Sequence, residues 1–99
     1  MKVLVDFNLI TVGTGLSISK YIADCERILQ KYGLETNIHA LGTNIEGEWK
    51  DISLALEECH QHLHNIGVER IFSSLKITSR TDKEQHIQEK IDAVVQHLR

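Results

Sequence analysis

A short stretch in the middle of the chain gathers side chains that could bind a small molecule. His39, Asn44, Glu46 and Glu48 follow one another within ten residues, and Asn8 interrupts an apolar segment near the N-terminus. Two carboxylates near a histidine favour a ligand that is cationic or donates hydrogen bonds, and the same groups are also suitable metal ligands. The next question is which elements would bring these residues together.

A glycine-rich segment and a histidine pair give weaker signals. Gly13-Thr14-Gly15 precedes an expected helix, where backbone N–H groups can hold a phosphate, but the more common role of such a segment is a turn with positive φ. His60 and His64 have the i, i+4 spacing that can chelate zinc or nickel. Because no third ligand is predictable, we expect no metal site and interpret the pair as part of a solvated helix face.

Two cysteines also lie on expected helices. Cys25 and Cys59 fall among apolar residues at helical spacing, which predicts buried, reduced thiols. Neither has a histidine in an obvious catalytic arrangement, so the sequence offers no nucleophile.

Hydrophobic periodicity defines the elements that must position these residues. Alternating apolar residues predict strands, stripes at helical spacing predict helices, and Gly33 and Gly67 end two of the helices. Strands are expected over 3–9, 36–41, 44–48 and 68–78, and helices over 18–32, 52–66 and 87–98, the last after a capping box at 81–84. This order predicts an α+β, ferredoxin-like βαββαβ sandwich with a four-stranded antiparallel sheet and an extra C-terminal helix.

Strand alternation then predicts which side chains share the sheet face that the two main helices leave uncovered. A hairpin turn at Gly42-Thr43 with Ile38, Ala40 and Ile45 toward the helices places the polar residues on the other face. The residues expected there are Asp6, Asn8, Asn37, His39, Leu41, Asn44, Glu46, Glu48, Phe72, Ser74 and Lys76, whereas Ile71, Leu75 and Ile77 are expected in the core. Such a mixed face fits a ligand cleft or a half-polar oligomer interface, and the pattern leaves both open.

Length and charge exclude several classes of protein. The 99 residues form one domain, 1–99, and the 11 Lys and Arg against 14 Asp and Glu give a formal charge of −3. An acidic chain argues against nucleic-acid binding. No apolar run approaches the length of a membrane span, and no export signal is evident, so we expect a cytoplasmic protein without a membrane partner.

The motifs taken together resemble the thiamine-binding protein family. The segment from Leu41 to Trp49, with its Ile-Glu-Gly-Glu-Trp block, is similar to the G-T-x-I-E-G-x-W signature of that family. Val5-Asp6, the turn from Val12 to Gly15 and Ser17-Ile18-Ser19 resemble its first strand and turn. The segment from Thr78 to Lys83 resembles the segment before its last helix. Thr11-Val12 departs from the pattern, which has a proline before the Gly-Thr pair.

The resemblance implies a ferredoxin-like subunit that assembles as a homo-oligomer, a dimer of dimers, and binds thiamine or its hydroxymethylpyrimidine part without catalysis. It implies no cofactor other than thiamine as bound ligand. Within that framework Glu46 and Glu48 are expected to balance the thiazolium charge or accept from the amino group. Asn8, His39 and Asn44 are expected to orient the pyrimidine, with further contacts from the Thr14 and Thr43 regions.

Two other classes of function remain open at this point. One is a structural or regulatory oligomer without a ligand, whose polar sheet face is only an interface. The other is a small enzyme of the dimeric ferredoxin-like type, with His39 and Glu46 as an acid–base pair.

Overall fold

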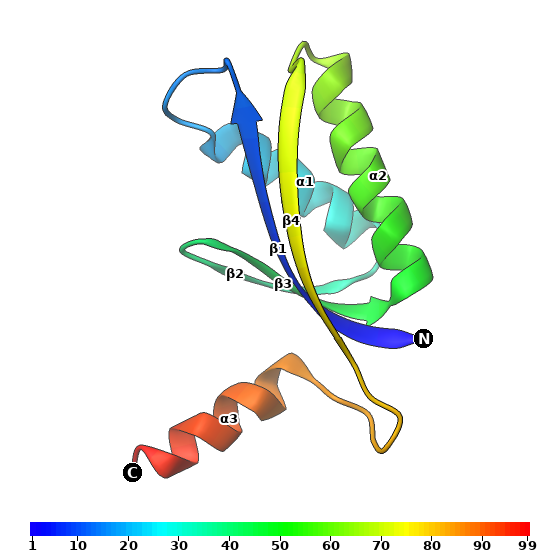
Figure 1. Ribbon diagram of the computed structural model, residues 1–99, viewed down its shortest axis with the longest axis vertical. Coiled ribbons are helices and arrows are strands. Elements are labelled where there is room, and N and C mark those ends of the chain that lie inside the picture. The colour runs from blue at the N-terminus through cyan, green and yellow to red at the C-terminus, as the bar shows by residue number, and fades with distance from the viewer.

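The chain forms three helices and one four-stranded antiparallel sheet. The computed structural model describes residues 1–99, and the strands lie in the order β2-β3-β1-β4 (Figure 1). The elements are β1 Lys2–Val12, α1 Ser19–Lys31, β2 Glu35–His39, β3 Gly42–Glu48, α2 Trp49–Asn65, β4 Arg70–Ser79 and α3 Ile87–His97. The order confirms the α+β, ferredoxin-like prediction.

The core lies between the sheet and the two long helices. Side chains of β1 alternate as predicted, so that Val3, Val5, Phe7 and Leu9 are buried beneath the helices. Helix α1 contributes Cys25 and Leu29, and α2 contributes Ile52, Ala55, Cys59 and Leu63 to the same cluster. The buried thiols are free, as the sequence predicted.

The β2–β3 hairpin turns earlier than the sequence suggested. Strand β2 ends at His39 and β3 begins at Gly42, so that Ala40 and Leu41 form the turn and the expected turn at Gly42-Thr43 is wrong. Ile38 therefore pairs with Thr43 and not with Gly47. The register differs by four residues, an even number, so the residues that pair keep the faces they were assigned. Ala40 and Leu41, which lie in the turn, do not, and Ala40 is exposed instead of facing the helices.

Strand β4 forms an exposed edge of the sheet. Its pairing with β1 places Phe72, Ser74 and Lys76 on the uncovered face, as predicted. Leu75 and Ile77 share the helix-side face but are 41% and 45% exposed, so the prediction that they are core residues is wrong. Ile38 at the opposite edge is 60% exposed for the same reason: the edges of the sheet extend beyond the two helices.

Helix α3 begins on the uncovered face of the sheet and then leads away from it (Figure 1). Ile87 in its first turn is buried, whereas Val94 and Leu98 remain exposed. The expected capping box at 81–84 does not cap this helix, because α3 starts only after His86. The N-cap residue of α1 is Ile18, which has no side chain that could cap the helix.

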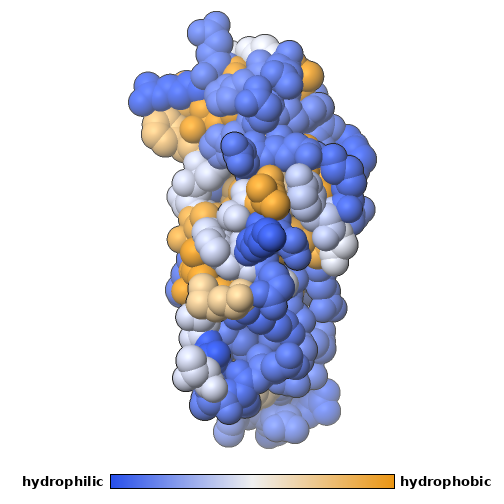
Figure 2. All heavy atoms as spheres, turned by 90° about the vertical axis from the view of Figure 1, so that its right-hand side faces the viewer, coloured by the Kyte–Doolittle hydropathy of each residue, from blue (hydrophilic) through white to orange (hydrophobic).

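One side of the molecule is mostly polar. Figure 2, which shows the right-hand side of Figure 1, presents a largely hydrophilic surface with hydrophobic atoms in separate areas. None of the helices combines the length and the apolar character that crossing a membrane requires.

Candidate functional site

The carboxylates and amides predicted to share the uncovered face do share it. In the register of β1 with β3, Asn44 lies opposite Asp6, Glu46 opposite Leu4 and Glu48 opposite Lys2. Leu4 is buried, which makes this part of the face partly apolar. The alternation of the strands was therefore sufficient to place these side chains.

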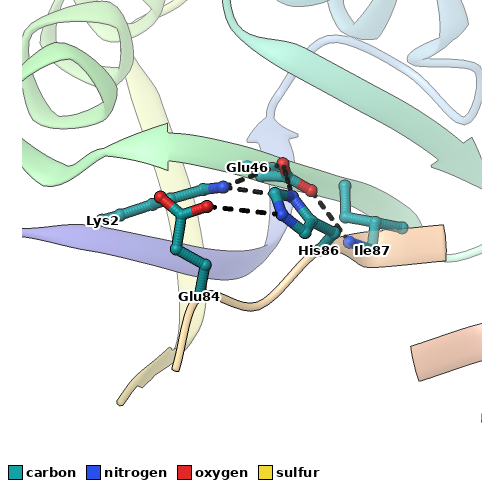
Figure 3. A network of polar contacts seen from close by, with 5 residues as sticks. All are labelled: Lys2, Glu46, Glu84, His86 and Ile87. Atoms are coloured by element: carbon teal, nitrogen blue, oxygen red, sulfur yellow. Dashed lines mark hydrogen bonds and ion pairs between the residues drawn. The ribbon is translucent and has the colours of Figure 1, made fainter. Parts of the chain in front are cut away.

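Glu46 holds the start of α3 against the sheet (Figure 3). Its carboxylate is 8% exposed, and Oε1 accepts a hydrogen bond from the backbone N–H of Ile87 at 2.8 Å. Oε2 accepts from Nδ1 of His86 at 2.8 Å and lies 3.3 Å from Nζ of Lys2. A carboxylate at a helix N-terminus satisfies a free backbone donor and interacts favourably with the helix dipole. Glu46 therefore caps α3 from a distant strand, and both of its oxygens already have partners.

The same contacts shift the pKa values of Glu46 and His86 in opposite directions. Burial acts to raise the pKa of Glu46, but hydrogen bonds from His86 and the Ile87 N–H, together with Lys2, outweigh it and lower that pKa. The hydrogen bond to Glu46 raises the pKa of His86, against the effects of burial and of the Lys2 charge. Both shifts favour the charged forms of this pair.

His39 and Glu46 do not form the acid–base pair that was considered. His39 Nε2 lies 2.7 Å from Oδ1 of Asp6, whereas Glu46 is bonded to His86. The structure thus supplies each member of the expected pair with a different partner.

Three further residues that were predicted to bind the ligand form hydrogen bonds or ion pairs within the chain. Asn8 donates from Nδ2 to the carbonyl oxygen of Leu41 at 2.6 Å, which ties β1 to the hairpin turn. Glu48 Oε2 lies 2.7 Å from the N-terminal amino group, with both groups exposed. The hydroxyl of Thr14 is hydrogen-bonded to that of Thr11 and stays within its loop. Glu48 and Thr14 therefore lie apart from the other candidates.

A shallow cavity lies between the uncovered face and α3. It measures about 190 Å³ and is lined by Asp6 and Asn44 from the strands, Lys76 from β4 and Lys90 from α3, among others. Two lysines and one aspartate make its charged lining predominantly cationic. Of the predicted site residues, only Asn44 lines it.

A second cavity, the hairpin pocket, lies on the helix side of the sheet. It measures about 240 Å³ between α1, the end of β1 and the β2–β3 hairpin, and 10 of its 15 lining residues are hydrophobic. Asn8, His39 and Thr43 are among its lining residues, but the strand alternation directs the Asn8 and His39 side chains to the uncovered face, and only that of Thr43 to the helix side. An apolar cavity with a few polar groups is the usual form of a small-molecule site.

Glu26 provides the charged group of the hairpin pocket. It lines the pocket from α1 and is 8% exposed; Oε1 accepts from the Thr36 hydroxyl, while Oε2 is buried without any hydrogen-bond partner. A buried polar atom left unpaired costs about 1–3 kcal/mol, which makes Glu26 a candidate for binding a hydrogen-bond donor.

Glu26 was not predicted from the sequence, although its position on the helix carried a signal. Glu26 lies four residues after Ile22 and three before Leu29, on the apolar stripe of α1. A lone carboxylate among positions that face the core is unusual and could have identified it.

Comparison with known proteins places the chain in a family. The model of the family described as "Thiamine-binding protein" matches residues 5–95. The chain belongs to this family. A UPF0045 protein of Synechocystis is 40% identical over 94 residues, covering 95% of this chain and 78% of that protein. A UPF0045 protein of Methanocaldococcus jannaschii is 39% identical over 93 residues, covering 94% and 92%.

Solved structures agree with the family assignment and with the fold. The crystal structure of a hypothetical protein from Methanocaldococcus jannaschii has a TM-score of 0.88 at 38% identity, covering 95% of this chain and 96% of that one. A Thermotoga maritima protein, named as a proposed thiamine biosynthesis/salvage protein, has a TM-score of 0.80 at 19% identity, covering 95% and 99%. At that identity the second likeness concerns the fold alone.

Proposed function

We propose that this member of the thiamine-binding family binds thiamine or its hydroxymethylpyrimidine part, without catalysis, in the hairpin pocket. The observation that carries the proposal is the buried, unpartnered Oε2 of Glu26, a residue that lines a mainly apolar cavity. The pyrimidine of thiamine carries an amino group that can donate to this oxygen, and a charge-assisted hydrogen bond is about twice as strong as a neutral one. Family membership supports the choice of ligand.

The size and lining of the hairpin pocket match the pyrimidine half of the ligand. Its volume of about 240 Å³ lies just below the range typical of sites for drug-sized molecules. An aromatic ring fits between the apolar walls, and Thr43, whose side chain lies on the helix-side face, supplies a polar group that could orient it. The cationic thiazolium would then lie toward the opening of the hairpin pocket, attracted by the negative charge of Glu26.

The uncovered face is the competing location for the same ligand. It holds Asn44, Glu46 and Glu48, but Glu46 already has a partner for each oxygen and Glu48 is paired with the N-terminal amino group. The cavity there also places two lysines near the space that a cation would occupy. We therefore favour the hairpin pocket and use the two glutamates to distinguish the locations.

Calorimetric titration of the purified protein with thiamine and with hydroxymethylpyrimidine tests the proposal. We expect binding in the micromolar range or tighter, and Glu26→Gln should weaken it about tenfold or more, because the amide offers no charge to the ligand's amino group. Glu57→Gln, at an exposed position on α2, is the matched control for the removal of one carboxylate. Binding unchanged in Glu26→Gln but weakened in Glu46→Gln would move the ligand to the uncovered face.

The same experiment separates a ligand-binding protein from a purely structural one. If neither compound produces heat at several temperatures while circular dichroism confirms a folded protein, the proposed function is wrong. The thermal stability of Glu26→Gln adds a second measurement. Removing a buried, half-satisfied charge should leave stability equal or higher, as expected of a residue retained for binding.

We also propose that the protein is a cytoplasmic homo-oligomer, a dimer of dimers. Two features support assembly: β4 is an unpaired edge strand with exposed Phe72, Leu75 and Ile77, and the apolar side chains of α3 beyond Ile87 are exposed. Unpaired edges of this kind are commonly covered by another chain. The free, buried cysteines suit a reducing compartment. Mass measurement in solution by light scattering tests the assembly.

A further inference from the structure

Two histidines lie one turn apart in the C-terminal half of α2, outside both cavities. The rings of His60 and His64 have centroids 6.2 Å apart and planes inclined by 60°. The spacing i, i+4 places both on one side of the helix, which is the spacing at which two histidines can chelate one metal ion. We propose that this pair binds a divalent transition metal of the class that prefers imidazole, namely copper, nickel or zinc.

The hydrogen bond of His64 leaves one ring nitrogen free to bind a metal. Its Nδ1 lies 2.8 Å from the carbonyl oxygen of Val68. A carbonyl oxygen only accepts, so Nδ1 carries the proton and Nε2 carries the free lone pair. Histidine ligands of metals typically donate their other N–H to a backbone carbonyl or a carboxylate in this way, which fixes the ring and its tautomer.

His60 is oriented by the neighbouring strand. Its Nε2 is hydrogen-bonded to the hydroxyl of Ser73 on β4, which leaves Nδ1 free or allows Nε2 to exchange this hydrogen bond for a metal.

The structure also defines what kind of site this can be. No group of three or more His, Cys, Asp or Glu side chains is arranged to hold a metal ion. A metal at His60 and His64 therefore has two protein ligands, and water completes its coordination. Such a two-point chelate should bind in the micromolar range, far more weakly than a closed structural zinc site.

Titration of the untagged protein with nickel chloride, followed by calorimetry, tests the site. We expect one Ni²⁺ per chain, and a loss of affinity of about tenfold or more in His60→Gln and in His64→Gln. His62→Gln is the matched control, because His62 lies between them on α2 but points to Asp24, with Nε2 3.0 Å from Oδ2. Circular dichroism establishes that each variant remains folded.

Two results would overturn the proposal. One is the absence of saturable binding at millimolar nickel. The other is binding that His60→Gln and His64→Gln leave unchanged, or that His62→Gln reduces equally, since it would then come from scattered surface histidines. A second readout is thermal unfolding: a metal that binds only the folded helix should raise the unfolding temperature of the parent and not of His64→Gln.

Discussion

Replacing Glu46 by glutamine should release the start of α3 from the sheet while leaving the rest of the fold intact. Glutamine keeps the shape of the side chain, and its single oxygen can still accept from the N–H of Ile87. Its NH₂ group would then face the N–H of His86 and the ammonium group of Lys2, which are donors as well. The charge-assisted contacts of Oε2 are therefore lost.

The size of the effect follows from the burial of Glu46. A hydrogen bond to a charged group contributes about 1.5–3 kcal/mol, and the Glu46 carboxylate is 8% exposed. We take about 2 kcal/mol for the loss of its charge, which corresponds to a roughly 30-fold increase in the population with α3 detached. Global stability should change little, because most of α3 beyond Ile87 is exposed and contributes few buried contacts.

Hydrogen–deuterium exchange followed by mass spectrometry measures this detachment directly. Peptides from the first turn of α3 should exchange faster by about that factor, whereas peptides from β1 and α2 should keep their rates. Glu84→Gln is the control, since Glu84 is 78% exposed and only approaches His86 Nε2 at 3.7 Å. Equal exchange of α3 in Glu46→Gln and the parent would refute the capping role, as would parallel acceleration of the core.

Three other changes have defined outcomes. Gly42→Ala should lower the urea midpoint, because its Cβ would lie 2.6 Å from the carbonyl oxygen of Phe7 and would force β1 and β3 apart; an unchanged midpoint would contradict this close approach. Leu29→Ala, at a core position 1% exposed, should cost about 2–5 kcal/mol in the same assay, and a cost below about 1 kcal/mol would show that the site collapses around the cavity. Protection of α3, corrected for intrinsic exchange, should be greatest between pH 4.5 and 6.5, the ordinary pKa values of Glu46 and His86. The lowered pKa of Glu46 makes its contribution fully present above pH 4.5 and lost on acidification below it. The raised pKa of His86 makes its contribution fully present below pH 6.5 and lost at higher pH. Protection that stays equally high well below pH 4.5 and well above pH 6.5 would contradict the pairing.

The order of elements and the sharing of faces could be predicted because both depend on local periodicity. Alternation of Val3, Val5, Phe7 and Leu9 is a property of one strand, and it was enough to place Asn44 and Glu46 on the uncovered face. The hairpin register could not be obtained in the same way. A shift by four residues preserves every face, so the hydrophobic pattern does not distinguish the two registers.

The candidate site was predictable only in part, since a side chain's partners depend on distant segments. Asn8, His39 and Thr43 are among the residues that line one pocket, but this pocket lies on the helix side of the sheet and not on the uncovered face where a ligand cleft was expected. Glu26, which comes from α1, was not among the predicted residues. Glu46 was expected to meet a ligand, and it caps a helix 41 residues further along the chain.

The sequence by itself determined the ferredoxin-like topology and the face of each strand residue, because both follow from short-range spacing. Short motifs such as Ile45-Glu46-Gly47 indicated the family for the same reason. Only the tertiary structure decided which polar groups are already satisfied. It left Oε2 of Glu26 without a partner and gave both oxygens of Glu46 partners from the other end of the chain. Hydrogen-bond satisfaction depends on atoms a few ångströms apart in space and far apart in sequence, and periodicity carries no information about them.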